Sequence, residues 1–195
     1  MFVVIEGIDG SGKTYSARKL VQLLREYGEE AMFTYEPYKA KQLNNYGLEH
    51  NLPQEYFLGL MVADRAYHVQ TVIEPALQAG VHVICDRFVY SNIAYQGYGG
   101  GLDIDTIVEL NKIATRGLEP DIVFYLNIPP KRALKNIIER DGTPSMDLDF
   151  IERVANGYKQ LAKQYNNWVI IDAVDNWDQK EDIMADYIIR ALNKL

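Results

Sequence analysis

The sequence predicts an α/β fold in which one five-stranded parallel sheet carries helices on both faces. Strand patterns alternate with segments of helical periodicity, and the strand patterns lie at residues 2–6, 31–36, 81–85, 121–127 and 168–172. The third and fourth patterns are almost wholly apolar, which is typical of parallel strands covered on both faces. Alternating strands and helices form such a sheet through right-handed crossovers.

A glycine-rich octapeptide joins the first strand pattern to the first helical pattern. It consists of Gly7, Ile8, Asp9, Gly10, Ser11, Gly12, Lys13 and Thr14. Between a strand and a helix this spacing is the phosphate-binding P-loop, whose backbone N–H groups converge on an anion at the positive end of the helix. We expect Lys13 to bridge the β- and γ-phosphates and the Thr14 hydroxyl to ligate Mg²⁺. A dinucleotide-binding turn is excluded because Tyr15 stands where its third glycine would fall, so the octapeptide predicts a nucleoside triphosphate site.

The other strands should place polar residues along the same rim of the sheet. Glu36 follows the second strand, Asp86 and Arg87 follow the third, and Asp172 ends the fifth. A carboxylate in the place of Asp86 can hold Mg²⁺, usually through water. Arg87 suits clamping a phosphoryl acceptor better than deprotonating water. The pair therefore favours phosphoryl transfer to a second phosphate over hydrolysis.

Two polar segments interrupt the alternation of strands and helices. Residues 38–55 are expected to pass over the substrate side of the sheet. Residues 141–147 separate two helical patterns and are expected to form a short mobile lid. Neither segment has the length or composition of an interdomain linker, so residues 1–195 are interpreted as one nucleotide-binding domain.

Composition limits the partners of the chain. The net charge of −7 disfavours binding to nucleic-acid polymers, and no apolar stretch approaches the roughly 20 residues that cross a bilayer. The only cysteine, Cys85, excludes an internal disulfide and is expected to be a buried structural thiol. The first strand begins at residue 2 and leaves no room for a signal peptide, so a cytoplasmic protein is expected.

Short motifs follow one another along the chain in a fixed order. They occupy residues 6–14, 35–37, 63–65, 73–77, 86–88, 91–97, 117–121 and 171–173. In order and spacing they resemble the thymidylate kinases, and the run Ala94-Tyr95-Gln96-Gly97 is the most specific of them. The resemblance covers nearly the whole chain. It implies a P-loop kinase fold, transfer of the γ-phosphoryl group of ATP to dTMP with Mg²⁺, and a homodimer.

The resemblance also assigns roles around the acceptor phosphate and sugar. Asp9 would lie near both, and Glu36 would sit near the deoxyribose and the metal. Arg87 would grip the acceptor phosphate. Tyr95 would lie beside the sugar, where its ring could disfavour a ribose 2′-hydroxyl. Together with Lys13, the residues Asp9 and Arg87 are expected to be catalytic.

The base is expected to meet a polar edge and a flat wall. By resemblance, Arg65 would contact the thymine edge, with Asn92 and Gln96 near the base. The phenylalanine that commonly stacks on thymine in the family is replaced by Met61, which is flexible and polarizable. Phe57, one turn earlier, could form part of the wall.

Two further departures from the family concern charge near the phosphates. Tyr35 stands where an arginine usually precedes Glu36, and Lys39 is a candidate substitute. Gly10 stands where some members carry a P-loop arginine, so the missing cation is expected in the lid. Helical spacing places Arg132 and Asn136 on one face with Arg140, and Arg140 is the candidate catalytic cation.

Two other functions remain open at this point. One is another nucleoside monophosphate kinase or a deoxynucleoside kinase with the same architecture. The other is a P-loop protein that binds ATP without catalysing transfer, which Arg87 argues against. A switch GTPase is disfavoured because the run from Asn111 to Ala114 lacks the aspartate that reads guanine.

Overall fold

The central strand β1 (Phe2–Glu6) shows why this chain forms a parallel sheet. All its residues are buried, and it pairs in parallel with a strand on either side. The sheet has the order β2-β3-β1-β4-β5 and is parallel throughout. The other strands are β2 (Ala31–Tyr35), β3 (His82–Asp86), β4 (Ile122–Asn127) and β5 (Trp168–Asp172). Each lies within one residue of its expected bounds, and the predicted fold is confirmed.

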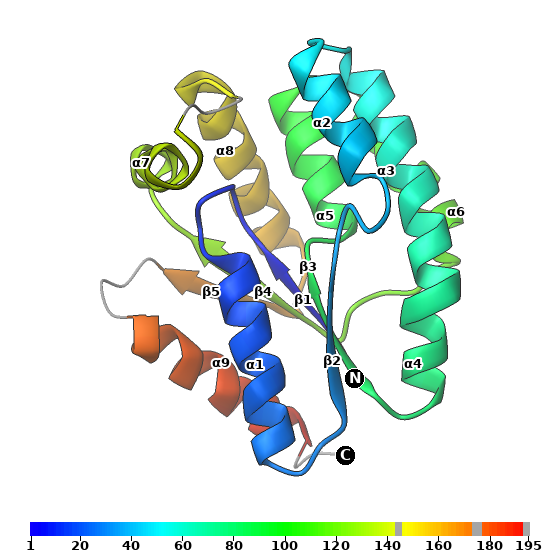
Figure 1. Cartoon of the computed structure of the whole chain (residues 1–195), viewed down its shortest axis with the longest axis vertical. Helices are drawn as coiled ribbons and strands as arrows, with labels where there is room; N and C mark the ends of the chain where they lie inside the picture. Colours follow the sequence, from blue (N-terminus) through cyan, green and yellow to red (C-terminus); the bar gives the residue numbers. More distant parts are fainter. Residues whose placement is uncertain (143–145, 173–176, 193–195) are drawn as a thin grey trace.

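Helices cover both faces of this sheet in the computed structural model. The structure describes residues 1–142, 146–172 and 177–192, and of residues 177–181 it describes the backbone alone. Helices α1 and α9 lie on one face, and the remaining helices pack on the other (Figure 1). The helices are α1 (Lys13–Glu26), α2 (Lys41–Glu49), α3 (Gln54–His68), η1 (Val69–Ile73), α4 (Glu74–Gln78), α5 (Val89–Asn92), η2 (Ile93–Gly99), α6 (Ile104–Thr115), α7 (Pro130–Asp141), α8 (Leu148–Gln164) and α9 (Trp177–Leu192).

The alternation of side chains along β1 divides the core into two layers. Val3 and Ile5 point to the face covered by α1 and α9, whereas Phe2 and Val4 point to the opposite face. Burial on both faces explains the apolar strands seen in the sequence. Cys85, on β3, is fully buried, and burial raises the pKa of its thiol well above the ordinary value, as expected for a structural residue.

The segment 38–55 is more ordered than a loop excursion. It contains helix α2 and the start of α3, and α2 packs on α3 through Gly47. A Cβ at Gly47 would lie 2.6 Å from the Tyr56 ring and 2.9 Å from the Phe57 ring, so the close packing depends on glycine. The segment therefore forms a helical wall.

The expected lid lies between the end of α7 at Asp141 and the start of α8 at Leu148. Residues 143–145 of this lid lie outside the described residues. The Asp147 carboxylate accepts the Phe150 N–H at 2.7 Å and caps α8, which fixes where the segment ends. No helix in the described ranges is both long and apolar enough to cross a membrane.

Candidate active site

The P-loop backbone adopts a shape that glycine permits. Gly7, Gly10 and Gly12 have φ angles of 147°, 79° and 88°, and Gly12 precedes the first residue of α1. A Cβ at Gly10 would lie 2.4 Å from the backbone oxygen of Ala133 on α7. The positive φ angle of Gly10 and this short distance mean that a larger residue at position 10 would require the backbone to move. The close approach of α7 therefore explains why this P-loop carries no arginine at position 10.

Lys13 is buried in the mouth of the P-loop. Its Nζ donates to the Ile8 carbonyl oxygen at 2.9 Å. Burial and the nearby Arg87 lower the pKa of Lys13 to about 8, although Asp9 and Asp86 act in the opposite direction. A phosphate in the loop would add the negative charge that favours the protonated ammonium.

Thr14 and Asp86 meet at the start of α1 and the end of β3. The Thr14 hydroxyl donates to Asp86 Oδ2, whereas Asp86 Oδ1 is buried with no hydrogen-bond partner in the part of the chain that the structure describes. An unpartnered buried carboxylate oxygen beside a hydroxyl fits a hard cation such as Mg²⁺. Among the described residues there is no group of three or more His, Cys, Asp or Glu that could hold a metal. A cation here would therefore take its remaining ligands from phosphate and water.

Arg87 is held in place from several directions. Its φ of 72° is unusual for a non-glycine residue. The guanidinium pairs with Asp9 through NH2, donates to Ser91 Oγ at 3.2 Å through NH1, and lies 5.1 Å from the centre of the Tyr95 ring. Burial acts to raise the pKa of Asp9, but Arg87 and Lys13 outweigh it and hold that pKa below its ordinary value. The Tyr95 hydroxyl accepts the Asp9 N–H at 3.0 Å.

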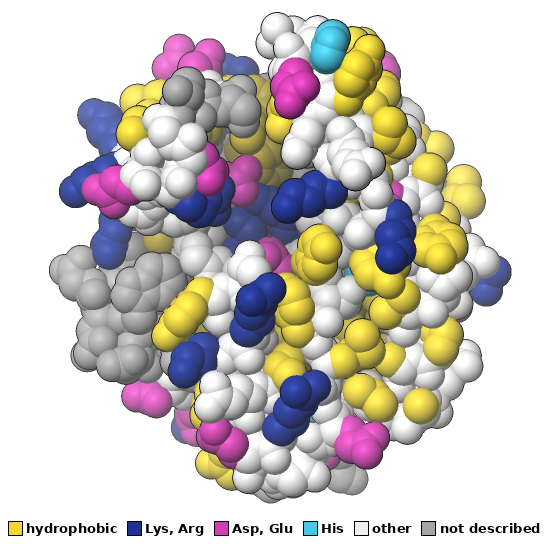
Figure 2. All heavy atoms as spheres, in the orientation of Figure 1, with side chains coloured by type: hydrophobic (Ala, Val, Ile, Leu, Met, Phe, Trp, Pro, Cys, Tyr) yellow, Lys and Arg dark blue, Asp and Glu magenta, His cyan; other side chains and the backbone are white. Residues whose placement is uncertain are grey.

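A cavity of about 970 Å³ opens above the carboxyl ends of the strands. Figure 2 shows this face hollowed between the α7–α8 side and the α2–α3 side, with Lys and Arg side chains at its floor. The residues expected at the acceptor site all line the cavity, namely Asp9, Glu36, Met61, Arg65, Arg87, Asn92, Tyr95 and Gln96. Phe57 lines it as well, so both candidates for the base wall face the same space.

Arg65 is almost completely buried, and its N–H groups are all engaged by the protein. Nε and NH2 donate to Glu36 at 2.9 and 2.5 Å, and NH2 also donates to the Phe88 carbonyl at 3.1 Å. NH1 donates to Asn92 at 2.7 Å and to Asn111. In this arrangement Arg65 has no N–H left for a base, so it orients Glu36 and Asn92. The expected contact with the thymine edge stays a prediction that requires a rearrangement.

Amide side chains continue from Asn92 along one wall of the cavity. Asn92 Nδ2 donates to Gln96 Oε1 at 2.8 Å, and Gln96 Nε2 donates to Gln54 Oε1 at 3.4 Å. Amides present both donors and acceptors, which is what recognition of a pyrimidine edge requires. Gln54 was not singled out from the sequence.

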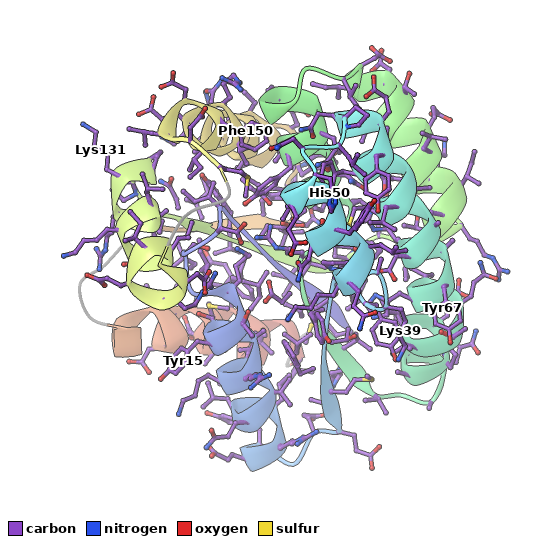
Figure 3. The ribbon with its side chains drawn as sticks, turned by 45° about the horizontal axis from the view of Figure 1, so that its top comes forward. Tyr15, Lys39, His50, Tyr67, Lys131 and Phe150 are labelled. Atoms are coloured by element: carbon purple, nitrogen blue, oxygen red, sulfur yellow. The ribbon has the colours of Figure 1, made fainter. Side chains whose placement is uncertain are left out.

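Helix α2 contributes polar wall residues that no motif indicated. They are Lys41, Asn44, Asn45 and Asn51, the last just beyond the helix. The polar composition of residues 38–55 was the available signal, but it did not specify which side chains face the cavity. Lys39, the candidate substitute for the missing arginine, lies over the Tyr38 ring at 4.6 Å. The Tyr38 ring stacks in turn on Tyr67 of α3, and Figure 3 labels both Lys39 and Tyr67. Lys41 is the lysine of this segment that lines the cavity.

Arg140 lies at the end of α7, between the large cavity and the P-loop. It lines the large cavity and also a smaller pocket beside Gly10 and Gly12. Its Nε and NH2 bond to the neighbouring Asp141 at 2.9 and 2.6 Å, and its side chain is 63% exposed. Asn136, one turn earlier, donates to the Gly10 carbonyl at 2.8 Å and ties α7 to the P-loop.

Comparison with known proteins points to one family. The family model described as thymidylate kinase matches residues 5–183. The thymidylate kinase of Exiguobacterium sp. (strain AT1b) is 38% identical over 204 residues, spanning 100% of this chain and 96% of that protein. The thymidylate kinase of Desulfovibrio desulfuricans is 40% identical over 190 residues, spanning 89% and 88%. The crystal structure of a thymidylate kinase from Ehrlichia chaffeensis is similar with a TM-score of 0.77 at 29% identity, covering 98% of both chains.

Proposed function

This chain belongs to the thymidylate kinase family and phosphorylates dTMP, and we propose that ATP with Mg²⁺ is the phosphoryl donor. The observation that supports the proposal best is the continuity of the P-loop with the acceptor cavity. Asp9 belongs to the P-loop and pairs with Arg87 at the cavity wall. The donor and acceptor phosphates would therefore meet at this ion pair.

The proposed reaction joins an oxygen of the dTMP phosphate to the γ-phosphorus of ATP. The bond between that phosphorus and the oxygen bridging to the β-phosphate breaks, and the products are dTDP and ADP. The P-loop N–H groups and Lys13 would hold the donor phosphates, and Arg87 would orient the acceptor phosphate and offset its charge. Arg140 would add a cation beside the transferring group, because it borders both pockets.

The side chains at the start of α1 and the end of β3 are suited to binding a metal ion. Thr14 and the unpartnered oxygen of Asp86 are the groups that would hold Mg²⁺, directly or through water. When bound, Mg²⁺ would neutralise charge on the donor phosphates. Removal of divalent cations with a chelator is expected to abolish turnover.

Tyr95 and the amide wall would select the acceptor. Tyr95 is fixed by the Asp9 N–H and lies where the resemblance puts the deoxyribose. Asn92 and Gln96 offer an amide edge to the base, while Met61 and Phe57 offer apolar surface. We also propose, from the family resemblance, a cytoplasmic homodimer; light scattering of the purified protein tests the dimer.

A coupled ADP-release assay over a panel of nucleosides and monophosphates tests the function. We expect the highest turnover with dTMP, followed by dUMP. Activity on thymidine with none on dTMP would identify a deoxynucleoside kinase and overturn the proposal. ATP consumption that no nucleotide acceptor increases would instead indicate a P-loop protein without an acceptor.

A further inference from the structure

A buried carboxylate that the proposed transfer does not use lies beneath the Arg87 turn. Glu6 is the last residue of β1 and is completely buried. Its Oε1 accepts the Phe88 N–H at 2.8 Å. Its Oε2 accepts the hydroxyls of Ser91 at 2.7 Å and Tyr158 at 2.9 Å. Glu6 therefore joins the central strand to the segment after β3 and to α8.

Ser91 connects this carboxylate to the guanidinium of Arg87. Its Oγ accepts from Arg87 NH1 at 3.2 Å while its hydroxyl donates to Glu6. On the backbone, the Arg87 N–H donates to the Ile5 carbonyl at 3.0 Å, and the next N–H, that of Phe88, donates to Glu6. Glu6 and its neighbour Ile5 thus hold Arg87 by both its backbone and its side chain.

The conformation of Arg87 explains why such support is needed. A φ of 72° is unfavourable for a residue with a Cβ and persists where the surroundings impose it. Burial raises the pKa of Glu6, whereas its hydrogen bonds and the nearby Arg87 favour the ionised form. The Glu6 carboxylate therefore interacts with Arg87 in two ways: electrostatically with its guanidinium, and through the Phe88 N–H with the turn that holds it.

We propose that Glu6 is a positioning residue for Arg87, acting through Ser91 and through the Phe88 N–H. Glu6 fixes the turn and restricts the guanidinium to the orientation in which it faces the acceptor phosphate. Tyr158 fixes the carboxylate in turn. This inference rests on the proposed transfer to dTMP, because its consequence is a defect specific to the acceptor.

The test compares wild type with Ser91→Ala, which breaks the side-chain link and leaves Glu6 bonded to Phe88 and Tyr158. We expect the KM for dTMP to rise roughly tenfold, as for loss of a hydrogen bond to a charged group, with the KM for ATP within about twofold of wild type.

Glu6→Gln is expected to lower kcat/KM for dTMP about 10- to 100-fold. Tyr125→Phe is the matched control, since Tyr125 stacks on Tyr158 at 5.4 Å but bonds to Asn127 outside this network. It should keep wild-type kinetics.

A double-mutant cycle separates positioning from a merely structural role. If Ser91 acts through Arg87, adding Ser91→Ala to Arg87→Ala should cause no further loss of activity. Additive losses, or wild-type kinetics in a folded Ser91→Ala protein, would overturn the inference even if Glu6→Gln fails to fold. A wild-type protein that is inactive on dTMP would instead refute the proposed function, so the two failures are distinguishable.

Discussion

Arg87 and Arg140, two of the arginines that line the large cavity, have opposite surroundings. Arg87 is 17% exposed and is held by Asp9, Ser91 and the Tyr95 ring. Arg140 is 63% exposed, and the ion pair it forms in the described residues is with its chain neighbour Asp141. We call the residues around Arg87 the acceptor side and the end of α7 around Arg140 the lid side, after the roles proposed for them. The acceptor side is therefore already organised in this structure, whereas Arg140 would have to leave Asp141 before it acted on a substrate.

This difference separates two ways of supplying charge to a reaction. A cation held in position stabilises developing charge without reorganisation at the moment of transfer. An exposed cation contributes only after it is ordered, and the exposed ion pair that Arg140 forms with Asp141 is readily exchanged. We infer that the acceptor side governs binding and orientation, and that the lid side governs turnover.

The largest effect is expected from Arg87→Ala. Loss of the held guanidinium should lower kcat/KM for dTMP by about 10²- to 10³-fold or more, as when a group that stabilises transition-state charge is removed. Steady-state kinetics with dTMP measures the loss. Arg87→Lys is the matched variant, and it should stay impaired because an ammonium cannot reproduce the fork that reaches Asp9 and Ser91. Wild-type turnover in either variant would place the acceptor phosphate elsewhere.

The next effect concerns the stability of the acceptor side. Arg65→Ala would leave the buried Glu36 carboxylate without its guanidinium, which typically costs about 3–5 kcal/mol. Urea unfolding of the variant measures this loss.

The control for that experiment is an exposed ion pair. Arg190→Ala removes the partner of Asp186 on α9, where the Arg190 side chain is 72% exposed, and should change the free energy of unfolding by less than about 1 kcal/mol. If Arg65→Ala and Arg190→Ala lower the free energy of unfolding equally, the buried contacts of Arg65 do not stabilise the acceptor side more than an exposed ion pair would.

The third prediction addresses the lid side. Arg140→Ala should lower kcat about 10- to 100-fold while leaving the melting temperature and the KM for dTMP near wild type, because the side chain is exposed and lies outside the buried network. Lys135→Ala is the control on the same helix, since Lys135 is 74% exposed and pairs with Glu139. A reduced melting temperature together with unchanged kcat would make Arg140 a structural residue.

The sequence was sufficient for the sheet and for the P-loop because both depend on local patterns. Apolar runs locate strands that are buried on both faces, and the glycines after β1 are required by positive φ angles. The order of motifs along the chain also indicated the residues expected at the acceptor site, and the structure brings these residues together around one cavity.

Contacts between distant segments could not be predicted in the same way. Arg65 was expected at the base, yet its N–H groups are engaged by residues 23 to 46 positions away in sequence, among them Asn111 on α6, whose helix carried no functional motif. Glu6 opens the motif at residues 6–14, but its contacts could not be predicted because its partner Tyr158 is 152 positions distant. Whether Lys39 replaces the missing arginine stays a prediction. In this structure Lys39 lies over the Tyr38 ring, whereas Lys41 lines the cavity.

The smallest effect is expected from Met61, whose flexible side chain lines the cavity. Met61→Phe should tighten dTMP binding about 2- to 10-fold if Met61 faces the base, because an aromatic ring adds stacking of about 0.5–1.5 kcal/mol to the area it covers. Titration calorimetry with dTMP measures the change, and Phe57→Leu is the companion variant. Phe57 is 7% exposed and packs edge-on against Tyr56, so it forms a more rigid part of the same wall. Unchanged affinity in Met61→Phe with weaker binding in Phe57→Leu would assign the base wall to Phe57, and Met61 would then only fill space beside it.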